Sequence, residues 1–214
     1  MKRINGHYII HEIEHVLHFE KGILFTVREL LMRPGENIRQ FLSADRSRLI
    51  KPVIFIIITS LIYSLVNNLF HIESAQGNLN EAKNSATALI FRWVQSHYGY
   101  ANMIMGVFIA VWLRLFFRKY PYNFFEVLIL LCFVMGMGML ILAVFALIQG
   151  LTGVALMTAA SIIAFAYCAW AIAQFYDKKR PVNYVKSFAS YMLGMVSFML
   201  LAIVLGTFID FIKH

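Results

Sequence analysis

The sequence has little charge and very little cysteine. Only 14% of its 214 residues are charged and 60% are hydrophobic, whereas about a quarter of the residues in a soluble domain are charged. A core of this size cannot bury so much apolar surface, which excludes an ordinary soluble domain. The two cysteines, Cys132 and Cys168, lie inside apolar runs, so the chain has neither a disulfide framework nor a Cys-x-x-Cys metal site.

The beginning of the chain lacks the apolar stretch of a secretory signal. Its first 20 residues instead hold Glu12, Glu14 and four histidines. We therefore expect no cleavable signal peptide, and expect the first apolar span to act as the targeting signal. The net charge is +8, yet no DNA- or RNA-binding motif accompanies it. We interpret the basic excess as a sign of membrane orientation and anionic lipid, and expect no nucleic-acid partner.

Five apolar runs are long enough to cross a bilayer, which takes about 20 residues. They cover residues 50–70, 99–117, 124–148, 152–175 and 188–209. We predict an all-α integral membrane protein with five transmembrane helices, preceded by short amphipathic cytoplasmic helices. Its two parts are a basic arm at residues 1–49 and a transmembrane domain at 50–214, with an external loop at 71–98.

The runs are almost free of ionisable residues. None has an Asp, Glu, Lys, Arg or His near its middle, and Arg114, Glu126 and Asp210 lie near the ends. Asn67, Asn68 and Asn102 are polar residues of the first two runs and lie near their outer ends. Because proton relays and ion paths use ionisable groups within the membrane, this pattern weighs against a pump or an ion-coupled transporter.

Basic connections alternate with non-basic ones along the chain. Residues 1–51 hold nine basic residues, and the connections after the second and fourth runs are also basic. The connection after the first run has only Lys83 and Arg92, and the one after the third run has none. The positive-inside rule then predicts a cytoplasmic N-terminus and an external C-terminus.

The arm is too polar to span a membrane, but it carries helical periodicity. Thr26 is a candidate N-cap with Glu29 three residues later, and Pro34 and Gly35 indicate a helix stop and turn. The following segment, ENIRQFLSADRSR, places Ile38, Phe41 and Leu42 on one side.

Helices of that kind commonly lie in the headgroup layer. Basic residues of the arm are therefore candidate contacts for lipid headgroups, although positive-inside anchoring would use the same side chains. These candidates are Arg33, Arg39, Arg46, Arg48 and Lys51.

Near its start the chain reads HEIEH, which matches the zinc-ligand pattern H-E-x-x-H. His11 and His15 could bind zinc, with Glu12 as general base and His18 as the nearest third ligand. However, His18 belongs to the same predicted helix, whereas zinc hydrolases of this pattern bring their third ligand from a separate element. At about 100° per residue, these histidines and His7 form one polar stripe opposite an apolar stripe. We therefore predict no catalytic residue, no bound metal and no cofactor.

The run HFEKGILFTVRELLMRPGENIRQFLSADRSRLIKPVIFIIITSLIY resembles the signature of a bacterial inner-membrane family, domain-of-unknown-function family 3667. Members typically show D/E-K-G, a hydrophobic stretch, T-x-R/K-E-L-x-x-R-P-G, a basic segment, and then Pro and the first span. The matching positions are Glu20, Lys21, Gly22, Thr26, Arg28, Glu29, Leu30, Arg33, Pro34, Gly35 and Pro52. Many members begin with a Cys-x-x-Cys zinc ribbon, which does not occur in this sequence. The resemblance implies a bacterial inner (cytoplasmic) membrane and no assigned activity.

These observations predict a protein that is not an enzyme. The expected function is that of a scaffold or accessory component, and its expected partners are membrane lipid and either a second copy of itself or another membrane protein. Small residues four apart in the fourth run, such as Ala160 and Ala164, are suited to close helix packing. One alternative is a transporter or channel for a neutral or apolar solute. Another is a membrane zinc hydrolase that uses His11, Glu12 and His15.

Overall fold

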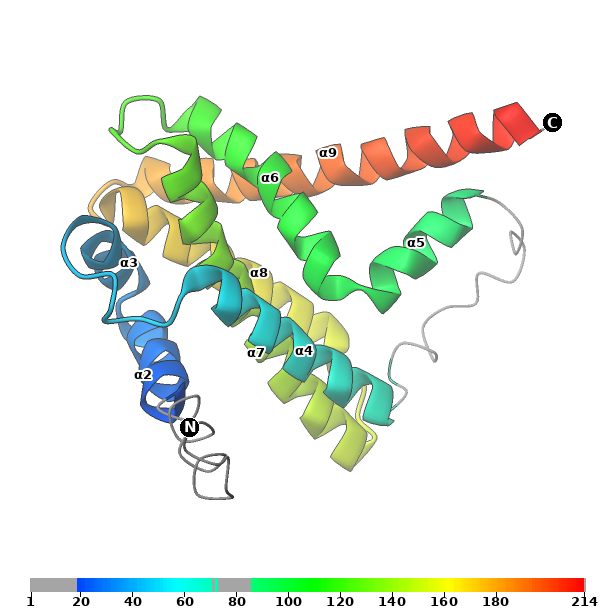
Figure 1. Cartoon of the computed structure of the whole chain (residues 1–214), viewed down its shortest axis with the longest axis horizontal. Helices are drawn as coiled ribbons and strands as arrows, with labels where there is room; N and C mark the ends of the chain where they lie inside the picture. The colour runs from blue at the N-terminus through cyan, green and yellow to red at the C-terminus, as the bar shows by residue number, and fades with distance from the viewer. Residues whose placement is uncertain (1–18, 71, 73–85, 214) are drawn as a thin grey trace, which may run out of the picture.

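A computed structural model of the chain describes residues 19–70, 72 and 86–213, and within these ranges all regular structure is helical. The helices, in order, are α2 (Phe19–Met32), α3 (Pro34–Ser43), α4 (Pro52–Phe70), α5 (Ala86–Ser96), α6 (Tyr98–Phe116), α7 (Phe124–Thr152), α8 (Met157–Asp177) and α9 (Pro181–Lys213) (Figure 1). Five of them, α4, α6, α7, α8 and α9, are long and apolar enough to cross a membrane. The prediction of an all-α protein with five spans is confirmed.

The outer surface of the bundle is apolar. On α4 the exposed residues repeat every fourth position, from Val53 through Ile57 and Leu61 to Leu65 and Leu69. The opposite face of α4 is buried against α7, with which it makes the most extensive helix contact of the described chain. A stripe of this kind marks a surface that faces lipid or another apolar partner, and α4 is one of five helices that are long and apolar enough to cross a membrane. The chain is therefore a multi-pass membrane protein.

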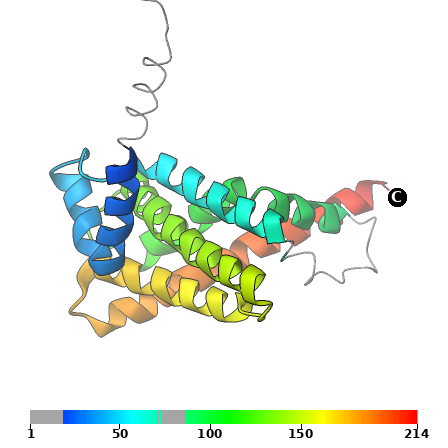
Figure 2. The ribbon, with the colours of Figure 1, turned by 90° about the horizontal axis from the view of Figure 1, so that it is seen from below.

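α7 is the central helix. In the most apolar 18-residue stretch of α7, 61% of the residues are buried, compared with 17% in the corresponding stretch of α9. Figure 2 shows α7 between α4 and α8. Gly136 allows this position, because a Cβ there would lie 2.8 Å from the ring of Phe55 on α4. A capping box fixes where α7 begins: Glu126 N donates to Asn123 Oδ1 and Asn123 N donates to Glu126 Oε2.

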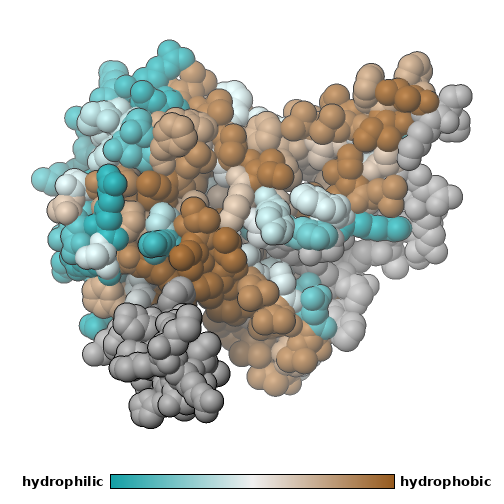
Figure 3. All heavy atoms as spheres, viewed as in Figure 1, coloured by the Kyte–Doolittle hydropathy of each residue, from teal (hydrophilic) through white to brown (hydrophobic). Residues whose placement is uncertain are grey.

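The two ends of the bundle differ in charge. We call the end that holds α2, α3 and the connections 117–123 and 178–180 the arm end, and the end where α4 and α7 finish the far end (Figure 1). Hydrophilic residues gather at the arm end, whereas the spanning helices are hydrophobic (Figure 3). The alternation of basic connections in the sequence thus corresponds to one basic end of the structure.

The last span begins earlier than predicted. The sequence indicated a basic loop up to residue 187, but α9 starts at Pro181 and leaves a connection of only three residues, 178–180. Proline suits the first turn of a helix because its missing N–H needs no partner there. Asn183 then ties this turn to the preceding helix, since its Nδ2 donates to Asp177 O at 3.1 Å and to Tyr120 Oη at 2.9 Å.

The apolar face of α3 packs on protein, whereas its sequence pattern suggested contact with the headgroup layer. Ile38 is fully buried and Phe41 is 5% exposed; only Leu42 of the predicted apolar face is partly exposed. The Phe41 ring meets that of Phe133 on α7 edge-on, with centroids 5.3 Å apart. An apolar helix face can be buried by lipid or by protein, and the sequence pattern does not distinguish the two.

Candidate functional site

Two features of the structure are candidates for function. The first is the contact between the arm and α8, which we call the α3–α8 joint and define by Gly35 and Arg39 on α3 and Gln174 and Phe175 on α8. The second is a cavity between the spanning helices, described below.

Gly35 brings the start of α3 directly against the backbone of α8. A Cβ added to Gly35 would lie 2.2 Å from both the carbonyl carbon and oxygen of Gln174, and 2.5 Å from Phe175 N. Since the atoms it would meet are backbone, only glycine permits this approach. Pro34 occupies the first position of α3, where it favours helix initiation. The Pro-Gly pair, read from sequence as a helix stop, therefore also begins the next helix.

Arg39, one turn after Gly35, caps the end of α8. Its Nη1 donates to Gln174 O at 2.6 Å and to Phe175 O at 2.7 Å. Both carbonyls belong to the last turn of α8, where backbone oxygens lack partners within the helix. The guanidinium also places positive charge at the negative end of the helix dipole. We expected Arg39 to contact lipid; the structure instead gives its guanidinium two protein acceptors.

Further hydrogen bonds connect α2 with α3 and with α8. Asn37 Nδ2 donates to Glu29 O and to Arg33 O, both at 3.0 Å, and so caps the end of α2. Tyr167 of α8 donates from its hydroxyl to Leu30 O at 2.9 Å. Carbonyls at the end of α2 therefore find partners in α3 and in α8.

Two residues of the family signature, Thr26 and Glu29, contact the connection between α3 and α4. Thr26 was predicted to cap a helix, but α2 begins at Phe19, so Thr26 lies inside it. Its Oγ1 is buried and accepts a hydrogen bond from Ile50 N at 3.2 Å. Glu29 Oε2 forms an ion pair with Arg48 Nη2 at 3.0 Å. Arg48 therefore also has a protein partner, while lipid contact by Arg33, Arg46 and Lys51 stays a prediction.

Two titratable groups near the arm have shifted pKa values. Hydrogen bonds from the Ser47 hydroxyl and backbone N–H lower the pKa of Asp45, which lies in the α3–α4 connection. Burial raises the pKa of Tyr122 in the α6–α7 connection, against an opposing effect of the Arg39 charge. The Tyr122 ring packs on that of Phe175 at 4.4 Å, so this connection also adjoins the α3–α8 joint.

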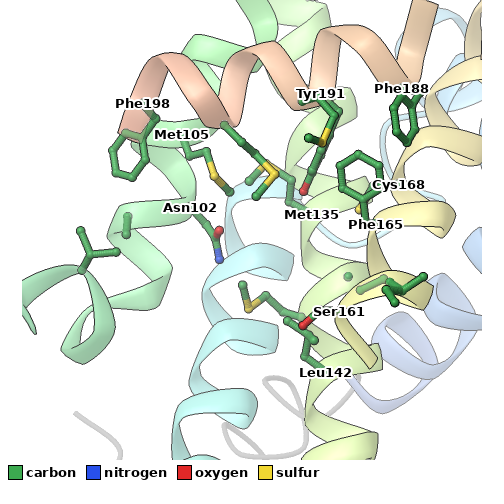
Figure 4. A pocket seen from close by; sticks show the side chains of 18 residues that line it. Asn102, Met105, Met135, Leu142, Ser161, Phe165, Cys168, Phe188, Tyr191 and Phe198 are labelled. Carbon is green, nitrogen blue, oxygen red and sulfur yellow. The ribbon is translucent and has the colours of Figure 1, made fainter. Parts of the chain in front are cut away.

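The second candidate, the α6–α9 cavity, has a volume of about 620 Å³ (Figure 4). Its walls include Asn102 and Met105 of α6, Met135 of α7, Phe165 of α8, and Phe188 and Met195 of α9. It extends from Asn102, which lies halfway along the bundle because Gly99 packs on Ser60 in the middle of α4, to Phe188 in the second turn of α9, near the arm end. None of the described residues that line it is charged.

The cavity opens sideways, toward the surface that faces lipid. Four of its lining residues are exposed: Ile162 of α8 at 66%, and Phe188, Met192 and Met195 of α9 at 51%, 41% and 38%. Methionine side chains are unbranched and flexible, so walls rich in them adapt to ligands of different shape. The sequence pattern gave no sign of this cavity, because its residues look like ordinary packing residues on five separate helices.

Four polar side chains line the cavity, and two of them donate hydrogen bonds to backbone carbonyls. Ser161 Oγ donates to Met157 O at 2.8 Å, and Cys168 Sγ to Val134 O at 3.6 Å. The Tyr191 hydroxyl lies beside the Cys168 side chain. Asn102 differs: it is only 5% exposed, and its Nδ2 is buried without a hydrogen-bond partner.

The metal candidates from the sequence, His11, His15 and His18, lie outside the described residues, as do His7 and Glu12. Within the described residues, no group of three or more His, Cys, Asp or Glu side chains could hold a metal ion.

Comparison with known proteins supports the resemblance. Residues 20–64 match the model of a family described as protein of unknown function (DUF3667). The match covers almost all of α2, all of α3 and most of α4, and so includes Gly35 and Arg39 of the α3–α8 joint. No curated protein and no solved structure matches the chain.

Proposed function

We propose that the protein is a non-enzymatic component of the bacterial inner membrane that holds an acyl chain of a membrane lipid in the α6–α9 cavity. The observation that carries this proposal is the cavity itself, with apolar walls, no charged lining residue among those described and a lateral opening within the membrane-spanning part. Its volume of about 620 Å³ lies in the usual range of ligand pockets, about 300–1,000 Å³.

The chemistry of the walls supports lipid as the occupant. A cavity lined by apolar side chains does not hold water well, and the bilayer around it supplies acyl chains at high concentration. An acyl chain can enter between α8 and α9, past Ile162 and Met195, without leaving the hydrocarbon layer. The alternative, a path for a neutral polar solute, would need polar walls, which is why we favour lipid.

The polar groups of the cavity also support a non-enzymatic role. The Ser161 hydroxyl and the Cys168 thiol are potential nucleophiles, but each donates to a backbone carbonyl. A nucleophile needs a neighbouring base that can take its proton. No histidine or carboxylate lines the cavity within the described residues.

For the orientation, we propose that the arm end faces the cytoplasm. Arg39, Arg48 and Lys51 of the arm, the connection 117–123 and the connection 178–180 bring basic residues to that end. The positive-inside rule places such an end on the cytoplasmic side.

The experiment uses the full-length protein and a phosphatidylethanolamine that carries a diazirine in one acyl chain. Photolysis should label residues of the cavity walls on α8 and α9. Ile162→Trp places bulk at the opening and should reduce this labelling several-fold. The matched control is Ile163→Trp, at the next position of α8, which is 45% exposed and does not line the cavity. Equal labelling of both variants, or labels spread evenly over the lipid-facing surface, would overturn the proposal.

A further inference from the structure

We propose that α6 carries a second lipid site, which holds the phosphate of an anionic phospholipid between Arg114 and Arg118. We call this surface the α6 groove and define it by Val111, Arg114, Leu115 and Arg118. One acyl chain of the lipid lies along the exposed apolar face of α6. The inference goes beyond the proposed function, because the groove is separate from the α6–α9 cavity and does not require that the cavity be occupied.

The starting observation is a surface hollow that two arginines share. Arg114 lies in the last turn of α6, and Arg118 follows the end of the helix at Phe116 by two residues. Together with Val111 and Leu115 they line a hollow of about 490 Å³, and the side chains of all four residues are exposed. The hollow therefore combines two guanidinium groups, which stay charged in proteins, with two aliphatic side chains.

Neither arginine is paired with a carboxylate in the part of the chain that the structure describes. The ion pairs found there engage Arg48 of the arm and Arg180 of the connection after α8. A guanidinium carries five N–H donors and no acceptor, so an anion in the α6 groove would meet two positive charges with donors to spare.

The α6 groove lies at the level where spanning helices end. The ring of Phe117, which is placed between the two arginines in the sequence, stacks on that of Tyr176 with centroids 3.8 Å apart. Tyr176 is the second-last residue of α8, so α6 and α8 end together at the arm end (Figure 1). Because the apolar length of a span matches the hydrocarbon core, the headgroup phosphates of a bilayer lie at this level.

An apolar stripe leads from the α6 groove into the membrane. Exposed apolar residues recur along α6 at every third or fourth position, at Ile104, Val107, Val111 and Leu115. A phospholipid with its phosphate at the arginines can lay one acyl chain along this stripe without leaving the bilayer. A charged end joined to an apolar stripe fits an amphiphile better than a soluble anion.

The double charge favours a lipid with a net negative charge. Arginine binds phosphate through parallel charge-assisted hydrogen bonds, and phosphatidylglycerol offers a phosphate without a cation of its own. Phosphatidylethanolamine carries an ammonium group beside its phosphate, which two arginines repel. Glycerol 3-phosphate shares the phosphate chemistry but has no acyl chain for the stripe, so a comparison of the three distinguishes a lipid from a soluble phosphate.

The test uses full-length protein in detergent and a phosphatidylglycerol that carries a diazirine in one acyl chain. Photolysis should label α6 between Ile104 and Leu115, apart from the cavity labels on α8 and α9. Unlabelled phosphatidylglycerol should displace the probe from α6 about tenfold better than phosphatidylethanolamine of the same chain length, which corresponds to about one charge-assisted hydrogen bond. Glycerol 3-phosphate should not displace it.

Arg114→Gln/Arg118→Gln should abolish the preference for phosphatidylglycerol. The matched control, Lys178→Gln/Lys179→Gln, removes the same charge from exposed residues at the arm end that do not line the α6 groove, and it should keep the preference. Loss of the preference in both variants would assign it to the general charge of the arm end and overturn the inference. A preference that survives in the arginine variant would overturn it as well.

Two further outcomes do not depend on whether any variant folds. Equal competition by the two phospholipids in the unmodified protein overturns the inference, and displacement by glycerol 3-phosphate would assign the groove to a soluble phosphate instead. Labels on α8 and α9 without labels on α6 would leave the proposed function intact and remove only the second site. The failures of the two proposals are therefore distinguishable.

Discussion

Gly35 of α3 and Gln174 of α8 touch through their backbones, so closely that a Cβ on Gly35 would lie 2.2 Å from the Gln174 carbonyl. Gly35 lies within the segment that matches the family model, residues 20–64, and Gln174 lies far outside it. The signature in this chain therefore includes residues that attach the arm to a distant spanning helix. This contact gives a structural role to a Pro-Gly motif that the sequence could explain only as a turn.

Gly35→Ala should detach the arm from α8. The added methyl group meets backbone atoms that cannot rotate away, so we expect destabilisation of about 1–3 kcal/mol, as for overpacking. The arm should also become accessible to protease before the spanning helices unfold. Thermal unfolding in detergent and limited proteolysis followed by mass spectrometry measure the two effects.

The matched control is the second glycine of the signature. Gly22 lies within α2, and a Cβ there would meet nothing within 4 Å. Gly22→Ala should therefore be neutral or stabilise the helix by about 0.5–1 kcal/mol. If Gly35→Ala behaved like Gly22→Ala, the close approach of α3 to α8 would be wrong.

Arg39→Gln should weaken the same joint by a different route. The change removes a charged donor from the carbonyls of Gln174 and Phe175 and should lower the free energy of unfolding by about 1.5–3 kcal/mol. Arg46→Gln, which removes an exposed arginine of the arm, should have little effect on stability. Chemical denaturation of the two variants side by side tests this. An equal loss of stability in both would indicate a general effect of arm charge.

Phe41→Ala should destabilise the protein by about 3–5 kcal/mol, because it opens a cavity where Phe41 packs on Phe133. Leu31→Ala is the comparison: Leu31 belongs to the arm but is 50% exposed, so its truncation should change stability little. Thermal unfolding of both variants, with and without added lipid, provides the measurement. If lipid restored the stability of Phe41→Ala, the apolar face of α3 would be in contact with lipid after all.

The five spans were predictable because their signal is local: each is one continuous apolar run of about 20 residues, the length that crosses a bilayer. The position of the arm was not predictable, since Ile38 and Phe41 form the same pattern whether lipid or protein covers them. The start of α9 was missed because its first two turns are polar, and they become helical through Pro181 and through the contacts of Asn183 with α8 and Tyr120.

The candidate sites were harder to predict for a related reason. Arg39 caps a helix that ends 138 positions later in the chain, at Asp177, and only folding brings the two together. One local hint existed: Arg39 follows Gly35 by four residues, which places both on one face of a helix. The α6–α9 cavity gave no local hint, because Met135 and Phe165 would look the same in a tightly packed core.

The orientation can be tested with single cysteines at the two ends of the bundle. In a background that lacks Cys132 and Cys168, Val154→Cys lies in the connection between α7 and α8 at the far end, and Lys179→Cys lies at the arm end. A membrane-impermeant maleimide added to intact cells should label Val154→Cys and leave Lys179→Cys unlabelled until the cells are opened. Early labelling of Lys179→Cys with no labelling of Val154→Cys would reverse the topology.

The last prediction concerns the HEIEH segment, which the structure does not describe. We expect the protein purified without chelator to contain no stoichiometric zinc, because the sequence places His18 on the same predicted helix as His11 and His15, whereas a zinc hydrolase takes its third ligand from a separate element. His7 shares their predicted stripe although it lies outside the H-E-x-x-H pattern, which favours a polar helix face over a ligand set. Metal analysis by mass spectrometry of the unmodified protein and of His11→Ala/His15→Ala tests this. Near-stoichiometric zinc that disappears in the double variant would contradict the prediction, and a peptidase activity abolished by Glu12→Gln would establish the enzyme that we do not expect.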